Sequence, residues 1–225
     1  MALWTRERSL YYFNGEQRSE EWFLARKNRL TASNVSAAVG RTTYGKKEVD
    51  LPSEIAANIR GETEKTEINE AQAQGINYEA GIRVEYEKRN GVVVREVGFV
   101  FNIDRPHLGV SPDGLVGEDG LIEIKCPQKI YERLLDVCEG RTKPYYLKDG
   151  IPSYIFPSHY DQMQTQMAVL GKKWCDYVVY CPADEIYIQH RVPFNPRHWK
   201  VLSLLIDRFI DRELKHTEAY VPVLD

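Results

Sequence analysis

Asp113, Glu123 and Lys125 are the side chains whose types and spacing could carry out a reaction. Asp113 stands in the segment Ser-Pro-Asp-Gly, and the other two follow in Leu-Ile-Glu-Ile-Lys-Cys. Two carboxylates can hold one hard divalent cation such as Mg²⁺ or Mn²⁺, and an amine beside them can act on a bound water molecule. No histidine or thiol is placed to complete a zinc site here, so the residues favour an oxygen-liganded ion.

A hairpin must bring these side chains together. Apolar segments flank the turn-rich residues 117–120, which predicts two short strands joined by a turn. Glu123 and Lys125 are two residues apart and share one face of their strand, whereas Cys126 lies on the other face. The turn returns Asp113 to within about one residue of Glu123. The apolar residues around Glu123 and Lys125 indicate that the second strand is central in its sheet. Charged side chains are costly there, so their presence favours a functional role.

Length and composition are those of an ordinary globular protein. The chain has 225 residues, of which 43% are hydrophobic and 28% are charged. We expect one domain over residues 1–225, with a motif-bearing core at about 19–192 and a final helix at about 195–215. No apolar run reaches the length of a membrane span and the first residues lack the core of a signal peptide, so we expect a cytoplasmic protein.

The net charge and the cysteine spacing limit which partners and cofactors the sequence favours. The net charge of −3 gives no general attraction to nucleic acid. Over residues 1–50, however, basic residues outnumber acidic ones and cluster at 26–29 and 46–47. Such clusters would let the chain bind phosphate locally. Scattered solvated lysines are the alternative. The four cysteines contain no Cys-x-x-Cys pair, so we expect free thiols and neither a zinc ribbon nor an iron–sulfur cluster.

The segment after the first helix is a candidate anion site. Ser19 caps that helix, basic residues 26–29 end it, and a second helix over residues 34–39 begins beside Thr31 or Ser33. Free backbone N–H groups at a helix start, with arginines nearby, attract anions. A simple helix cap is the alternative.

Helices and strands alternate along the rest of the chain, with an acidic connection over residues 61–69 and a long loop over 140–157. Ile76, Ala80 and Val84 are the expected buried side of one long helix. We expect further helices over residues 48–60, 70–89, 130–137, from 158 and over 195–215, and strands over 92–95, 98–101, 173–180 and 185–188. This order predicts an α/β fold with a central mixed β-sheet flanked by helices on both sides.

The motifs and their order resemble the PD-(D/E)xK nuclease superfamily, in the version carried by lambda-type exonucleases and YqaJ-like viral recombination nucleases. The resemblance covers about residues 22–180 and implies a restriction-endonuclease-like core. It rests on Trp22-x(3)-Arg26-x(6)-Ser33, Gly75-x-x-Tyr78-Glu79, Ser111-Pro112-Asp113-Gly114, Glu123-Ile124-Lys125-Cys126-Pro127 and Gln162-Met163-Gln164-x-x-Met167. The glycine-lysine loop Gly45-Lys46-Lys47 is also similar.

The resemblance implies a metal site. Asp113, Glu123 and the main-chain carbonyl of Ile124 would hold Mg²⁺, with Mn²⁺ as the alternative and two ions during catalysis. Lys125 would orient or deprotonate the attacking water, which Gln162 would approach.

The resemblance also implies residues around that site. Glu79 would be an additional acid supporting the second ion; the alternative is an exposed pair with Arg83 one helical turn later. Arg26, Ser33 and Ser111 would seat a DNA phosphate.

As an activity, the resemblance implies removal of one strand from duplex DNA ends, 5′ to 3′, leaving 3′ single-stranded tails. Partners would be DNA, two further copies in a trimeric ring and a single-strand annealing protein, in a bacterial host cell that carries a phage or prophage. A ring would hold a chain of net charge −3 on DNA by topology. The alternatives are an endonuclease of the restriction or repair type that uses the same site, and a non-catalytic DNA-end-binding domain.

Overall fold

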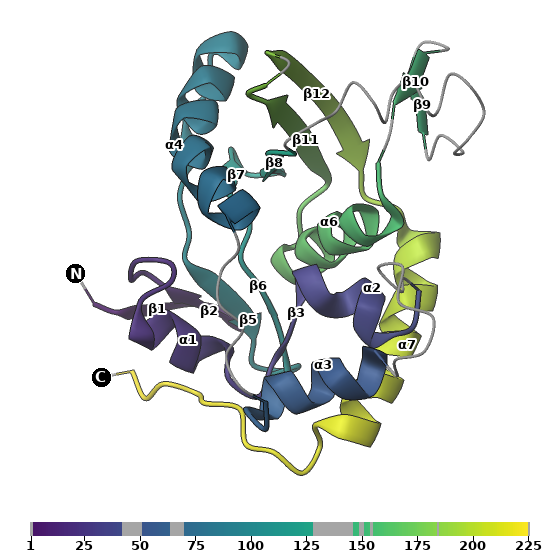
Figure 1. The fold of residues 1–225 in the computed structure, drawn as a ribbon. Coiled ribbons are helices and arrows are strands. Elements are labelled where there is room, and N and C mark those ends of the chain that lie inside the picture. Colours follow the sequence, from purple (N-terminus) through teal and green to yellow (C-terminus); the bar gives the residue numbers. More distant parts are fainter. Residues whose placement is uncertain are drawn as a thin grey trace.

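The computed structural model describes residues 2–41, 51–63, 70–127, 146–148, 151–153, 155–183 and 185–224. The expected helix over residues 130–137 and the loop Gly45-Lys46-Lys47 lie outside them. The elements are β1 Trp4–Glu7, β2 Leu10–Phe13, α1 Glu20–Arg26, β3 Leu30–Thr31, the 3-10 helix η1 Ala32–Asn34, α2 Val35–Ala38, α3 Leu51–Arg60, α4 Glu70–Asn90, β4 Val94–Arg95, β5 Phe99–Asn102, β6 Leu108–Val110, β7 Gly114–Val116, β8 Gly120–Lys125, β9 Tyr146–Lys148, β10 Ile151–Ser153, α6 Pro157–Leu170, β11 Trp174–Cys181, β12 Ile186–Pro193 and α7 Pro196–Glu213 (Figure 1).

One mixed sheet carries the predicted hairpin. Its strand order is β12-β11-β8-β7-β4, with β8 parallel to β11 and the other pairs antiparallel. Gly114 pairs with Ile122, so the turn places Asp113 beside Glu123, as the sequence predicted. Gly120 must be glycine, because a Cβ there would lie 2.2 Å from the Trp174 ring. The α/β class and the central position of β8 are confirmed.

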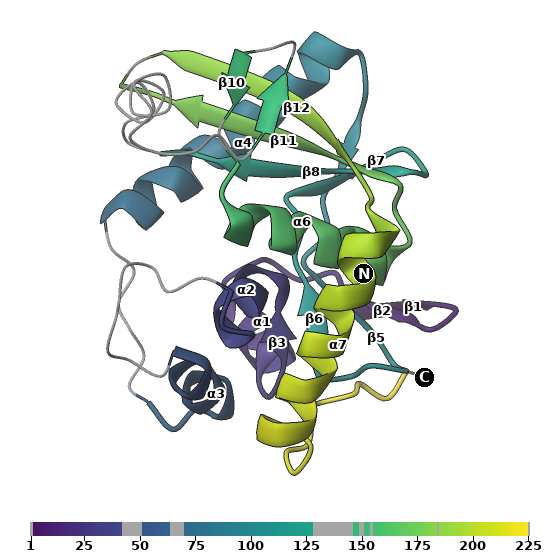
Figure 2. The same ribbon diagram turned by 90° about the vertical axis from the view of Figure 1, so that its right-hand side faces the viewer.

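Helices cover both faces of this sheet, also as predicted. On one face, Ile122 and Ile124 pack with Ile82 and Tyr86 of α4. On the other, Leu121 packs with side chains of α6, which runs beneath β8 and β11 (Figure 2). Because successive strand residues alternate, Glu123 and Lys125 of β8 face α6.

The expected buried side of α4 is wrong. Ala80 is exposed and Val84 is 63% exposed, whereas Ile82 and Tyr86 are buried, at 5% and 0%. The side chain of Ile76 lies outside the described residues. The tyrosine hydroxyl donates to Asp176 Oδ2 of β11 at 2.6 Å. This hydrogen bond to β11 lets Tyr86 lie on the buried face of α4. The pattern of apolar residues along the helix does not by itself indicate this contact.

A second five-stranded sheet has the order β1-β2-β5-β6-β3. It begins with a hairpin formed by the first residues of the chain, which the sequence motifs do not cover. Trp4 and Phe13 of that hairpin pack with Phe101 of β5 and Trp22 of α1. This sheet therefore supports α1, the helix that carries Arg26.

Two further expectations are corrected in part. The long loop expected over residues 140–157 contains the short antiparallel strands β9 and β10. The helix expected over residues 34–39 is the short α2, preceded by η1. Neither η1 nor α2 is capped by a side chain at its N-terminus. Thr31 and Asn34 hold the two N-cap positions, and their side chains make no capping hydrogen bond. No helix in the described ranges has both the length and the apolar character that a membrane crossing requires.

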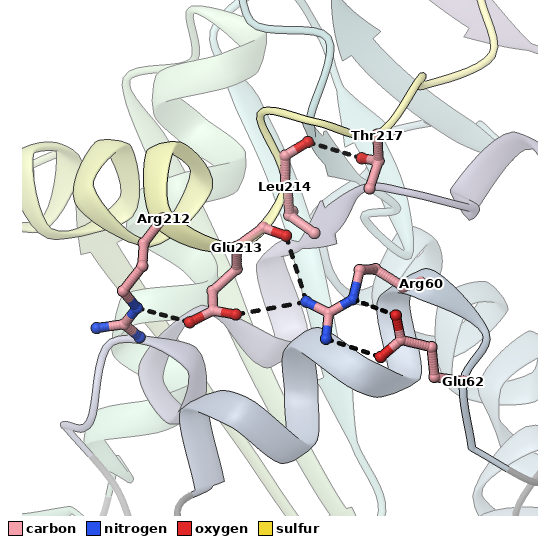
Figure 3. A network of polar contacts seen from close by, with 6 residues as sticks. All are labelled: Arg60, Glu62, Arg212, Glu213, Leu214 and Thr217. Carbon is pink, nitrogen blue, oxygen red and sulfur yellow. Dashed lines mark hydrogen bonds and ion pairs between the residues drawn. The ribbon is translucent and has the colours of Figure 1, made fainter.

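The final helix, α7, agrees with the sequence. The Asn195 side chain caps it by accepting from the backbone N–H groups of Arg197 and His198, each at 3.1 Å. Its other end is tied to α3 by Arg60, which contacts Glu213 and pairs with Glu62 (Figure 3).

After α7, the chain runs back to the end of α1 and to β1. Asn28 donates to the carbonyl of Glu218 at 2.8 Å, and the Trp4 and Tyr220 rings lie 6.3 Å apart. Arg29 is 1% exposed and donates to the carbonyls of Ala25, Pro106 and Tyr220.

Candidate active site

Glu123 is the centre of the buried polar group on β8. Its side chain is 2% exposed. Lys125 Nζ and Gln162 Nε2 donate to Glu123 Oε1 at 2.6 and 2.7 Å, and Gln166 Nε2 donates to Oε2 at 2.8 Å. Lys125 Nζ also donates to Gln162 Oε1 at 3.1 Å. A buried carboxylate is therefore held by an amine and by two amides from α6.

Asp113 lies immediately before β7, beside this group. Its Oδ2 accepts the backbone N–H of Ile124 at 2.6 Å, and its main-chain carbonyl accepts from Arg83 at 3.0 Å. Burial raises the pKa of Asp113 well above its ordinary value, and the nearby carboxylates of Glu123 and Glu79 raise it further. Acids gathered in this way repel one another unless a cation lies among them.

Lys125 is the cation that the chain itself provides. Burial lowers the pKa of Lys125, but the carboxylates of Glu123 and Asp113 outweigh burial and hold it above its ordinary value. Lys125 and Glu123 point from one face of β8 toward α6, as their spacing predicted.

The donors here fit Mg²⁺ or Mn²⁺. Two carboxylates and a main-chain carbonyl are hard oxygen ligands, and Mg²⁺ commonly uses one or two carboxylates and keeps several waters. In the part of the chain that the structure describes, no three or more His, Cys, Asp or Glu residues form a metal-holding group. The Oγ of Ser111, two residues before Asp113, is buried without a hydrogen-bond partner there. A polar atom of this kind suits a phosphate oxygen or water.

Among the described residues, Glu79 makes no hydrogen bond to this group. Its carboxylate lies 3.6 Å from Arg18, whereas Arg83 pairs with Glu96 at 2.9 Å. The alternative of an exposed pair between Glu79 and Arg83 is therefore wrong. Glu79 acts on Asp113 through its charge, and a role at a second ion stays a prediction.

Arg26 has the surroundings of an anion-binding group. Its guanidinium lies 4.0 Å from the centre of the Trp22 ring and 5.9 Å from that of Phe99. Burial, helped by the charge of Arg18, lowers its pKa to about 10. Among the described residues no carboxylate or carbonyl pairs with it, which leaves its donors for a ligand.

Ser33 lies on η1, which packs against α6. Its side chain is exposed, and its Oγ is 3.2 Å from the hydroxyl of Thr31. Arg26 and Thr31 line one hollow of about 590 Å³. The structure thus brings Asp113, Glu123, Lys125 and Gln162 together, whereas Arg26 lies on α1 and Ser33 on η1.

Sequence reasoning missed two buried contacts of α6. Gln166 stands four residues after Gln162 on α6, but the motif does not indicate its bond to Glu123. His198 lies with Nε2 2.7 Å from Asp161 Oδ1, and Arg41 donates to Asp161 Oδ2 at 2.8 Å. The four-residue spacing from Gln162 to Gln166 was the available signal for the first contact; no sequence signal shows the second.

Comparison with known proteins gives consistent similarities. Residues 21–173 match the YqaJ-like viral recombinase domain family. An alkaline exonuclease from Laribacter hongkongensis, LHK-Exo, is 31% identical with a TM-score of 0.64, covering 86% of this chain and 91% of that one. Its complex with dAMP gives 29% identity and a TM-score of 0.67 over the same shares.

Two more distant similarities extend the comparison. A phage related exonuclease from Haemophilus somnus 129PT is similar in fold, with 14% identity and a TM-score of 0.57 over 83% of this chain and 92% of that one. Uncharacterized protein R354 of Acanthamoeba polyphaga mimivirus is 27% identical over 175 residues, which are 76% of this chain. The match spans only 30% of that relative's length.

Proposed function

Because the chain belongs to the YqaJ-like viral recombinase domain family, we propose that it is a metal-dependent exonuclease that hydrolyses phosphodiester bonds at the ends of duplex DNA. The observation that carries this proposal is the buried carboxylate of Glu123, hydrogen-bonded to Lys125 and flanked by Asp113. Charges on a central strand cost folding free energy, and a bound cation and its phosphate ligand would offset that cost.

Each side chain of the site has its own role in this proposal. Asp113, Glu123 and the carbonyl of Ile124 would hold Mg²⁺ or Mn²⁺, and Glu79 would support a second ion. When bound, the ion lowers the pKa of a water molecule and offsets charge on the phosphate oxygens. Lys125, kept as an ammonium ion by the carboxylates of Glu123 and Asp113, would orient the attacking water, and Gln162 Oε1 accepts from its amine.

Arg26, Ser33 and Ser111 would bind the terminal phosphate. For Arg26→Ala we expect the kcat/KM on 5′-phosphorylated ends to fall about tenfold or more, because charge-assisted hydrogen bonds are lost. The loss on 5′-hydroxyl ends should be smaller. The measurement compares both substrates, with the exposed Arg208 of α7 changed to alanine as the control. An equal loss on both ends would remove Arg26 from the phosphate site.

We also propose, from the family resemblance, that removal runs 5′ to 3′ and leaves 3′ tails for a single-strand annealing protein. Three subunits would form a ring around the DNA. A ring would explain how a chain of net charge −3 stays on its substrate, with retention that depends little on salt. Sedimentation at working concentration should give three times the chain mass.

The deciding experiment incubates end-labelled linear duplex DNA with the protein and Mg²⁺, with and without EDTA. We expect the label to leave from the 5′ end, and chelation to stop the loss. Cutting of a covalently closed duplex circle would instead indicate an endonuclease. Binding to ends with no Mg²⁺-dependent loss of DNA would indicate a non-catalytic end-binding domain.

A further inference from the structure

Two buried glutamines of α6 hold the two oxygens of Glu123 separately. Gln162 and Gln166 are 8% and 0% exposed and stand one helical turn apart. Gln162 Nε2 donates to Oε1 of the carboxylate and Gln166 Nε2 donates to Oε2. The amides therefore fix the rotation of the carboxylate as well as its position.

The hydrogen bonds also distinguish the two oxygens of Glu123. A carboxylate offers about four lone-pair sites, two on each oxygen. Lys125 and Gln162 occupy both sites of Oε1, whereas in the described part of the chain only Gln166 donates to Oε2. The remaining lone pair is therefore on Oε2 of Glu123, and the Gln166 amide sets the direction in which it points.

We propose that Glu123 binds the metal ion through Oε2 and that Gln166 is the positioning residue that aims this oxygen. The inference rests on the proposed metal-dependent function and adds to it a residue and a specific ligand atom. Groups that hydrogen-bond to a metal ligand typically change metal affinity or activity by about 10- to 100-fold when they are removed.

The other end of the Gln166 amide supports this placement. Its Oε1 is buried and has no hydrogen-bond partner among the described residues. A buried amide oxygen rarely stays unpaired, so it suits a water molecule of the site. Gln162, by contrast, uses both ends of its amide on Glu123 and Lys125.

Gln164 provides a matched control on the same helix. It is also 0% exposed, but its amide donates to the carbonyl of Pro193 at 3.0 Å and accepts from the backbone N–H of Asn195 at 2.8 Å. Gln164→Met should therefore lower the melting temperature and leave the metal site unchanged.

The test measures Mn²⁺ binding to the full chain without DNA, from the electron paramagnetic resonance signal of free Mn²⁺. For Gln166→Met we expect a Kd for Mn²⁺ about tenfold higher than for the parent. The Mg²⁺ concentration for half-maximal digestion should rise with it, and saturating Mg²⁺ should restore most of kcat. Gln166→Asn, whose shorter amide cannot reach Oε2, should show the same change if the methionine variant does not fold.

The outcomes separate this inference from the proposed function. If the parent binds Mn²⁺ and digests DNA but both Gln166 variants keep its Kd, Gln166 does not position the ligand and the function stands. If Gln164→Met raises the Kd as much as Gln166→Met, the effect is one of stability and the inference is also wrong. If the parent shows no Mn²⁺ binding and no digestion, both proposals fail together.

Discussion

Changing Lys125 to methionine is expected to lower kcat on linear duplex DNA by about a hundredfold or more, because in the proposed reaction the amine orients the attacking water in the transition state. Glu123 keeps its two glutamine donors, so the site should stay folded and DNA affinity should change little. Single-turnover digestion at saturating Mg²⁺, with binding measured in Ca²⁺, separates the two quantities.

Lys173 supplies the control for this prediction. It is also a lysine of an ion pair, with Asp119 at 3.0 Å, but its side chain is 73% exposed. Lys173→Met should therefore keep the parental kcat. A Lys125→Met protein that digests DNA as fast as the parent would show that the amine has no part in the reaction.

Changing Arg29 to methionine is expected to lower the free energy of unfolding by about 3 kcal/mol, because buried carbonyls would lose their donor. Arg29 donates to Pro106 at 2.7 Å and to Ala25 at 2.6 Å, reaches the carbonyl of Tyr220, and its guanidinium lies 4.0 Å from the centre of the Phe101 ring. Burial alone lowers its pKa to about 10. Urea denaturation followed by circular dichroism measures the change.

Arg212 is the matched surface arginine. Its side chain is 63% exposed and pairs with Glu213 at 2.6 Å, so Arg212→Met should cost at most about 1 kcal/mol. If the two substitutions shift the denaturation midpoint equally, the buried contacts of Arg29 contribute no more than a surface pair.

The hairpin and its charges could be predicted from sequence because each step depends on neighbouring residues. Strand alternation put Glu123 and Lys125 on one face, and the turn at 117–120 returned Asp113 to Glu123. The final helix was predictable for the same reason, since Asn195-Pro196 and the apolar spacing that follows are local signals.

The contacts that were missed join segments far apart in the chain. The bond from Gln166 to Glu123 spans 43 residues, and that from Tyr86 to Asp176 spans 90. From sequence alone, a polar residue in such a position can be either exposed or buried against a partner that lies far along the chain. The buried face of α4 was therefore assigned wrongly. The second sheet was missed because its first hairpin carries no motif.

The return of residues 214–224 to α1 has a practical consequence for handling the protein. The carbonyls of Glu218 and Tyr220 accept from Asn28 and Arg29, two and three positions after Arg26. Expression vectors that trim these last residues, or fuse an affinity tag directly to them, would disturb the loop beside the expected phosphate-binding arginine. We expect such a preparation to discriminate less between 5′-phosphorylated and 5′-hydroxyl ends, although the carboxylates of Asp113 and Glu123 remain in place.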